Sequence, residues 1–294
     1  MLLKPDCIPC IVKMIISYIR KLSGDEKDCR ELMTRFLRLP VLRGERWDMT
    51  SPEAIEPVMD MMRETFGADD PFQDIKEEEN ARALELYPWL QQSVRESQDP
   101  LFAAVNLAIL GNRVDIMVFD RSMDMKEVLA KELRNPISAK PFEIFREKLA
   151  KAGHLLYLGD NSGEIVFDRL LIETITDLYE PQITFVARNL PALNDVTLRE
   201  ARRVEMDRVA RVMSNGMDGC VCGTVLSRCS PELRELFGSS ELVISKGGGN
   251  FETLENETHQ CRNITFLLLA KCVPYCNYFK TGMFEPVLMN FYET

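Results

Sequence analysis

The stretch HLLYLGDNSGEIVFDRLL, from His154 to Leu171, decides the fold of this chain. It begins with an apolar run of strand length, turns at Gly-Asp-Asn-Ser-Gly, and continues with the apolar spacing of a helix. Asp160 and Asn161 stand side by side where the strand should turn into the helix. Two interpretations compete: a glycine turn that binds a cofactor, and a set of oxygen ligands for a metal ion.

Similar apolar runs recur after this stretch, at QITFVAR, VARVMS, ELVISK and NITFLLLAK, and helical segments separate most of them. Alternating strands and helices predict a parallel sheet with helices on its faces. The runs are continuously apolar, as is typical of strands that are covered on both faces.

The chain before residue 150 is predicted to be helical. TSPEAIEPVMDMMRETFG has the capping-box spacing of Thr50 and Glu53 and a terminating Gly67. A second helical segment is expected to be interrupted near Pro88, and an apolar helix is expected to end near Gly111.

We therefore predict an α/β fold, in which a helical N-terminal domain packs on a doubly wound, mainly parallel sheet with helices on both faces. The helical domain is expected at 1–150 and an α/β metal- and phosphate-binding domain at 151–294.

Composition excludes several classes of protein. The 294 residues carry a formal net charge of -10, which argues against a nucleic-acid-binding protein. No apolar run is long enough to span a bilayer, and the start MLLKPDCIPC lacks the pattern of a secretory signal, so we expect a cytoplasmic protein. In a reducing compartment the nine cysteines are expected to be mostly free thiols, or in part metal ligands.

Polar residues gather where three of the predicted strands end. The first strand is followed by Asp160, Asn161 and Glu164, the second by Arg188, Asn194 and Asp195, and the fourth by Ser245, Lys246, Gly247, Gly248, Gly249 and Asn250. In a parallel sheet these turns share one edge, which is where ligands bind in open α/β sheets.

These residue types suit a phosphoryl site. Asp160, Asn161 and Asp195 offer hard oxygen ligands of the kind that Mg²⁺ and Mn²⁺ prefer. Lys246 supplies a cation, and the glycines after it free backbone amides to approach an anion.

Other interpretations stay open for the same residues. Asp160 and Asp195 have the sequence context of helix N-caps, and SKGGGN has the composition of a flexible turn. LLYLGDNSGE also looks like the first motif of S-adenosylmethionine-dependent methyltransferases, although Asp160 and Asn161 occupy the turn where small residues would be needed. The dinucleotide pattern G-x-G-x-x-G and the phosphate loop ending in G-K-[ST] are both absent.

Four ordered motifs, LAILGNRVD, GDNSGEIVFDRLL, LNDVT and SKGGGNFETL, resemble those of the metal-dependent damage-control phosphatases. This family was long filed as a domain of unknown function, and its eukaryotic relatives were labelled acidic-residue methyltransferases. The N-terminal CIPC extends the resemblance to nearly the whole chain and is similar to the branch found mainly in prokaryotes.

The resemblance implies a site between the helical and α/β domains that hydrolyses small phosphorylated metabolites with Mn²⁺, Mg²⁺, Co²⁺ or Ni²⁺. It places the metal ligands on Asp160, Asn161 and Asp195 and the phosphate-binding lysine on Lys246. Asn112 and Asp115 match a further site motif, for which a helix C-terminal turn is the alternative.

The resulting hypothesis is a metal-dependent phosphomonoester hydrolase. Its catalytic residues are Asp160, Lys246 and Asp115, the last as general acid/base or in support of the site, and water attack and an aspartyl-phosphate intermediate both stay open. The residues expected to bind substrate are Asn112, Arg188, Lys246, Gly247, Gly248 and Asn250. The alternatives are a thiol-ligated metal or iron–sulfur protein with an anion-binding α/β domain, and an S-adenosylmethionine-dependent carboxyl methyltransferase.

The cysteines suggest a second, separate site. Cys7 and Cys10 have the spacing of a metal-binding pair, and Cys272 follows the last predicted strand. The resemblance includes all three, so we expect them to lie close together, with Cys276 or the pair Cys220 and Cys222 as further candidates. A metal held there would be softer than one held by Asp160 and Asp195. The alternative is that these are buried thiols that act as small apolar side chains.

Overall fold

A six-stranded sheet with the order β3-β2-β1-β4-β5-β6 forms the centre of the computed structural model, which describes residues 1–113, 125–258 and 263–292. The strands are β1 (His154–Leu158), β2 (Gln182–Ala187), β3 (Arg211–Ser214), β4 (Leu242–Lys246), β5 (Asn263–Leu269) and β6 (Pro286–Tyr292). The first five are parallel, and β6 pairs antiparallel with β5. The doubly wound, mainly parallel sheet is confirmed; the edge strand β6 was not among the predicted strands.

The strand order reverses at β1. This strand pairs with β2 on one side and with β4 on the other, so the chain winds outward from the centre in both directions. The crevice between the carboxyl ends of β1 and β4 is the switch point, where an open α/β sheet binds its ligands.

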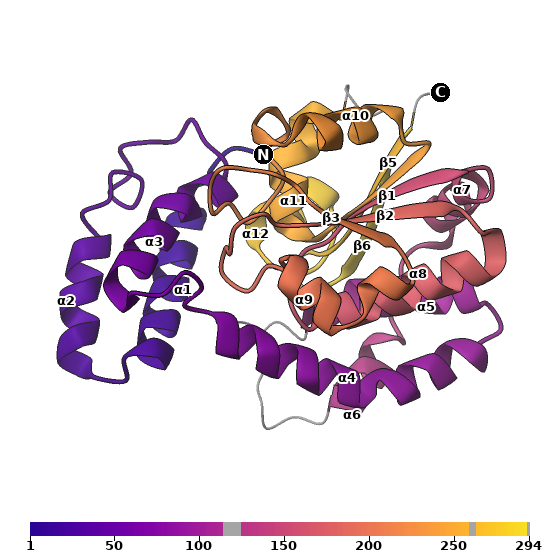
Figure 1. The fold of residues 1–294 in the computed structure, drawn as a ribbon, viewed down its shortest axis with the longest axis horizontal. Helices are drawn as coiled ribbons and strands as arrows, with labels where there is room; N and C mark the ends of the chain where they lie inside the picture. Colours follow the sequence, from indigo (N-terminus) through magenta and orange to yellow (C-terminus); the bar gives the residue numbers. More distant parts are fainter. Residues whose placement is uncertain (114–124, 259–262, 293–294) are drawn as a thin grey trace.

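Helices cover both faces of the sheet (Figure 1). Leu155 and Tyr157 face one core, which is covered by α4 (Gln73–Arg95), α5 (Pro100–Leu110), α6 (Met125–Glu132), α7 (Ala139–Leu149), α8 (Glu164–Tyr179) and α9 (Leu198–Arg203). Leu156 and Leu158 face the other core, which is covered by α10 (Pro231–Ser239), α11 (Gly247–Leu254) and α12 (Val273–Phe279). Alternation along a strand sends successive side chains to opposite faces, so β1 serves both cores.

Three N-terminal helices form a separate lobe at the left of Figure 1. These are α1 (Cys7–Leu22), α2 (Glu26–Phe36) and α3 (Ser51–Phe66), and they enclose a third core around Ile15, Tyr18 and Phe36. Ala192 and Leu193 from the loop after β2 join this core and fasten the lobe to the sheet. The division at residue 150 stays a prediction, but helices on both sides of it share the first core of the sheet.

Short 3₁₀ helices complete the described secondary structure: η1 (Gly111–Arg113), η2 (Met206–Arg208), η3 (Leu226–Arg228) and η4 (Glu255–Glu257). The predicted cap of α3 is present, since Thr50 and Glu53 form a capping box and Gly67 closes the helix at φ 62°.

The predicted interruption at Pro88 was wrong. Helix α4 runs through this residue without a break. Pro88 and Leu84 lie on the exposed side of α4, where water can satisfy the carbonyl that the proline leaves without a donor. Within the described ranges, none of the helices combines the length and the apolar character that a bilayer crossing requires.

Candidate active site

The loops after β1 and β2 are joined by backbone hydrogen bonds. Val196 N donates to Asp160 O over 2.9 Å, Ser162 N donates to Asn194 O over 2.8 Å, and Asn161 forms an isolated bridge with Asp195. The predicted ligands from two strand ends are therefore brought together, as convergence at one edge of a parallel sheet requires.

Neither aspartate caps a helix. The N-cap of α8 is Gly163, three residues after Asp160. The N-cap of α9 is Thr197, which forms a capping box with Glu200. The side chains of Asp160 and Asp195 are therefore not used to begin these helices, and the alternative interpretation as N-caps does not hold.

Helix α4 supports both loops from one side. Asn80 Oδ1 accepts a hydrogen bond from Gly163 N over 2.7 Å, and Glu79 Oε2 accepts one from Asn194 Nδ2 over 3.2 Å. Asn80 and Glu79 are adjacent and buried. A rigid helix thus fixes the position of the two polar loops.

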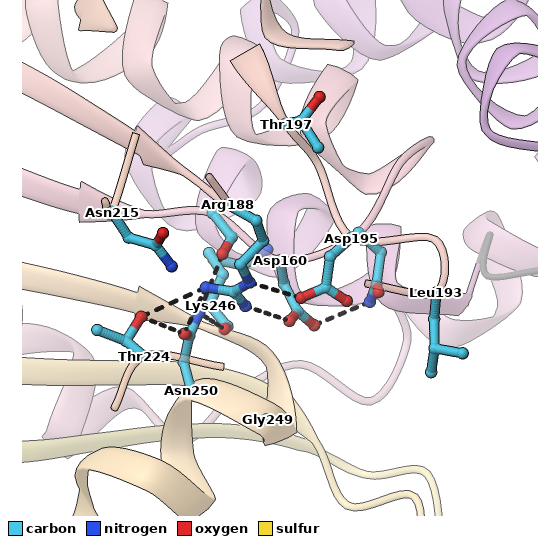
Figure 2. Close-up of polar contacts among 12 residues, drawn as sticks. Asp160, Arg188, Leu193, Asp195, Thr197, Asn215, Thr224, Lys246, Gly249 and Asn250 are labelled. Carbon is cyan, nitrogen blue, oxygen red and sulfur yellow. Dashed lines mark hydrogen bonds and ion pairs between the residues drawn. The ribbon is translucent and has the colours of Figure 1, made fainter. Parts of the chain in front are cut away.

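Arg188 makes polar contacts with both aspartates (Figure 2). Its Nε donates to Asp195 Oδ2 over 2.6 Å, and its Nη2 lies 3.4 Å from Asp160 Oδ1. Nη1 donates to Asn250 Oδ1 over 3.0 Å and to Thr224 Oγ1 over 3.3 Å. Burial acts to lower the pKa of the guanidinium, but Asp195 and Asp160 outweigh it and raise that pKa.

Among the residues that the structure describes, buried carboxylates outnumber buried cations at this end of the sheet. Asp160, Glu164, Asp168 and Asp195 share it with Arg188 and Lys246, and all six are buried. Burial raises the pKa of Asp160 well above its usual range, and the charges of Asp195 and Glu164 raise it further against Arg188 and Lys271. Such an excess of buried negative charge is unfavourable unless a proton or a bound cation offsets it.

The glycine turn after β4 lies against Asp160. Gly247 has φ +77°, and a Cβ on it would stand 1.8 Å from Asp160 Oδ2, so only glycine fits here. The turn forms the start of α11, which has no side-chain N-cap. The first backbone amides of this helix therefore lack a side-chain cap, and Gly248 and Gly249 of its first turn line the cavity described below.

Lys246 points away from this turn, into the core under α5 and α8. Its Nζ donates to Ala108 O and Asp168 Oδ1, each over 2.7 Å, and to Glu164 Oε1. Burial acts to lower its pKa, but Asp168 and Glu164 raise it to about 12. Burial raises the pKa of Asp168 to about 6 despite the attraction of Lys246.

A cavity of about 250 Å³ lies between the N-terminal lobe and the carboxyl edge of the sheet. It is lined by Asp160, Asn161, Asp195, Asn112 and Gly248 of the predicted set. Arg188, Lys246, Gly247 and Asn250 do not line it; they lie behind its wall. Among the described residues, the basic side chain that does line it is Lys271, two residues after β5, which sequence reasoning missed.

Asn112 connects the cavity to the buried charges. Its Nδ2 lies 3.5 Å from Asp160 Oδ2 and also donates to Glu164 Oε2. Asn161 Nδ2 donates to the same Asp160 oxygen over 2.8 Å. The predicted general acid/base Asp115 lies outside the described residues.

The predicted cysteine set lines the same cavity. Cys7, Cys10 and Cys272 face it together with Cys222 and the buried Glu252. Burial raises the pKa of Cys272 to about 12, and the nearby Glu252, Cys7 and Cys10 add to the rise. Within the described ranges, no three or more His, Cys, Asp and Glu side chains are arranged so as to hold a metal ion. A thiolate-bound metal therefore stays a prediction.

The proposed metal ligands Asp160, Asn161 and Asp195 have buried polar neighbours. Arg188 binds one oxygen of Asp160 and one of Asp195, and the third member of the predicted set is an amide, Asn161. The donor chemistry, the burial and the excess of negative charge fit a hard divalent cation.

The damage-control phosphatase ARMT1-like domain matches residues 3–287 of the chain. The chain belongs to this family. A DUF89 family protein of Pyrococcus horikoshii, solved as a crystal structure, has a TM-score of 0.86 and 27% identity over 99% of each chain. The fold and the family predicted from the motifs are thus confirmed.

Curated relatives of this damage-control phosphatase family member come from archaea. A damage-control phosphatase of Pyrococcus horikoshii is 32% identical over 70% of each chain. A damage-control phosphatase of Archaeoglobus fulgidus is 26% identical over 93% of this chain and 94% of its own. An uncharacterized protein of Methanocaldococcus jannaschii is 28% identical over 98% and 95%. Family membership favours a metal-dependent phosphatase over the thiolate metal protein and the methyltransferase.

Proposed function

We propose that this protein is a metal-dependent phosphomonoester hydrolase that acts on a small phosphorylated metabolite. The observation that carries the proposal is the buried pair Asp160 and Asp195 at the switch point, with more buried carboxylates than buried cations around them among the described residues. Asp160, Asn161 and Asp195 would hold the metal. A bound divalent cation would polarise the phosphate and lower the pKa of a water molecule.

Arg188 and helix α4 position these ligands. The guanidinium binds Asp160 Oδ1 and Asp195 Oδ2, which orients both carboxylates without lining the cavity. Asn80 and Glu79 hold the two loops that carry them. Partners of this kind keep ligands in place before the substrate arrives.

We assign the recognition of the phosphate to Lys271 and to the first amides of α11, in place of Lys246. Lys271 and Gly248 both line the cavity, and Lys271 is close enough to Asp160 to lower the pKa of that carboxyl. Lys246 is turned into a buried network with Glu164 and Asp168. Donors that face the reacting phosphate stabilise the charge that develops on its oxygens.

Oxygen donors favour Mn²⁺ or Mg²⁺ as the metal, with Co²⁺ and Ni²⁺ as further candidates from the family resemblance. We further propose that the protein works in the cytoplasm. The cysteines that the structure describes are all free thiols, as a reducing compartment maintains them.

The test is release of inorganic phosphate from small phosphomonoesters by chelator-treated protein, with each of the four metals added back. We expect hydrolysis that depends on metal and is lost in Asp195→Asn. Metal-independent hydrolysis, or none with any metal and ester, would refute the proposal. Methyl transfer to carboxylates in the presence of S-adenosylmethionine would favour the methyltransferase instead.

A further inference from the structure

The cavity has two chemically different ends. Asp160, Asn161, Asp195 and Lys271 gather at the edge of the sheet. The opposite wall comes from the N-terminal lobe and the loop after β2, and its side chains are mainly apolar. Its apolar side chains are Ile11, Met14, Pro52, Ile55 and Leu193, and the polar ones on the same elements are Asp6, Ser51 and Asn194. The body of a substrate held by its phosphate at the sheet would contact this wall.

One face of α1 supplies much of the wall. Cys7, Cys10, Ile11 and Met14 line the cavity, and their spacing places them on one side of the helix. Met14 is buried, with 7% of its surface exposed, and belongs to the core of the lobe. Thiol and thioether groups are weak hydrogen-bond partners and behave here as apolar surface.

Few uncharged groups on this wall could pair with the hydroxyls of a sugar or polyol, and Asp6 is the carboxylate that the wall presents in the described ranges. The hydroxyl groups among the lining residues in the described ranges are those of Ser51, at the start of α3, and of Tyr275, which already donates to Glu252 Oε1. A substrate hydroxyl that gives up its water without a new partner lowers affinity on the order of tenfold. A methylene group placed against such a wall raises kcat/KM by about as much.

The charged residues around the cavity also restrict the charge of the substrate. Away from the proposed metal ligands, the charged lining residues in the described ranges are Asp6, Glu252 and Lys271. Lys271 is assigned to the phosphate, so the acidic pair would face the body of the substrate. Glu252 is buried, and burial raises its pKa. A second anionic group on the substrate would meet no second cation among the cavity-lining residues that the structure describes.

We infer that the substrate is a phosphomonoester with a small, uncharged, mainly apolar body, and that α1 and α3 select it. This inference rests on the proposed phosphatase function of the same cavity. The volume of about 250 Å³ lies below the ~300–1,000 Å³ of sites for larger ligands, so the body is small.

The experiment compares three esters of nearly equal size with the Mn²⁺-loaded protein: 3-methylbutyl phosphate, glycerol 1-phosphate and 3-phosphoglycerate. We expect kcat/KM for 3-methylbutyl phosphate to exceed that for glycerol 1-phosphate at least about tenfold, with 3-phosphoglycerate lowest. Equal or higher kcat/KM for either polar ester would overturn the inference.

A variant tests the wall itself. Met14→Gln keeps the length of the side chain but adds an amide, so the preference for 3-methylbutyl phosphate should narrow about tenfold. Val12→Thr is the matched control on α1, because Val12 does not line the cavity, and it should keep the wild-type preference. An unchanged preference in Met14→Gln would contradict the role of α1.

Binding separates this inference from the proposed function. The phosphonates that correspond to the three esters cannot be hydrolysed, and their affinities for the Mn²⁺-loaded protein can be measured by calorimetry. Should no ester be hydrolysed with any metal, the phosphatase proposal fails. The order of phosphonate affinities still decides whether the wall prefers an apolar body, and tighter binding of the polar ones would refute it.

Discussion

Arg188 Nε donates a hydrogen bond of 2.6 Å to Asp195 Oδ2 on the side of the carboxylate that the cavity does not reach. The same guanidinium lies 3.4 Å from Asp160 Oδ1, so one buried cation holds the two aspartates of neighbouring strand ends together. The shared guanidinium explains how two carboxylates stay buried side by side. One positive charge balances only one of the two negative charges.

Replacing Arg188 should destabilise the protein strongly. Arg188→Met removes the cation from a buried pair, which typically costs about 3–5 kcal/mol in the free energy of unfolding. Urea unfolding of the metal-free protein measures this, and saturating Mn²⁺ should recover part of the loss. Arg199→Met is the control, since Arg199 pairs with Glu77 at the surface and should cost less than about 1 kcal/mol. Equal losses in the two variants would contradict the account.

Asp160→Asn should stabilise the metal-free protein at neutral pH while abolishing metal-dependent hydrolysis. The pKa of Asp160 is raised on folding, mainly by burial and by Asp195. Above the unfolded pKa of 3.8 and below the folded pKa, the native state binds more protons, so the free energy of unfolding falls as pH rises.

The difference in thermal stability between Asp160→Asn and wild type, in the presence of chelator, measures this pH-dependent destabilisation by Asp160. It should be larger at about pH 8 than at about pH 5, because above pH 3.8 the unfolded wild-type chain releases a proton that the native state still holds, and wild type loses stability as pH rises. A variant that is less stable than wild type at the higher pH would count against an excess of buried negative charge.

The two lysines should behave oppositely. Lys246→Met leaves Glu164 and Asp168 buried without their cation and should lower the free energy of unfolding by about 3–5 kcal/mol. Lys271→Met should cost less stability, because Lys271 is only half-buried, and should lower kcat/KM on the order of a hundredfold through lost phosphate contact. Denaturation and steady-state kinetics on both variants decide this. A folded, stable Lys246→Met with greatly weakened phosphate binding would restore the assignment made from sequence.

Asn80→Ala should weaken metal binding although Asn80 does not line the cavity. Its Oδ1 accepts from Gly163 N at the end of the loop that carries Asp160 and Asn161, and loss of such support typically lowers metal affinity about 10–100-fold. Calorimetric titration with Mn²⁺ gives the affinity. Gln92→Ala is the control, since Gln92 bonds Glu96 on the exposed side of the same helix. Wild-type Mn²⁺ affinity in Asn80→Ala would contradict the role of α4 in positioning the metal ligands.

The convergence of Asp160, Asn161 and Asp195 was predictable from sequence. Each follows an apolar strand, and in a parallel sheet the carboxyl ends of neighbouring strands meet at one edge. That Thr197 and not Asp195 begins α9 was also within reach, because Thr197 and Glu200 have the spacing of a capping box.

The direction of Lys246 could have been read from the alternation of β4. Ile244 lies in the core under α5 and α8, and Lys246 comes two residues later, so its side chain leaves the strand on the same face. Lys271 carries the signal that drew attention to Lys246, a lysine at the end of an apolar strand, and was overlooked. The apolar wall depends on how the lobe packs against the sheet, which no local pattern of α1 encodes.

The most direct test of the central claim is the anomalous scattering of manganese in crystals of the protein grown with Mn²⁺. The account predicts a peak bounded by Asp160, Asn161 and Asp195, on the cavity side of Arg188. A peak at Cys7, Cys10 and Cys272 instead, or a site with ordered Asp160 and Asp195 and no manganese between them at saturating Mn²⁺, would contradict it.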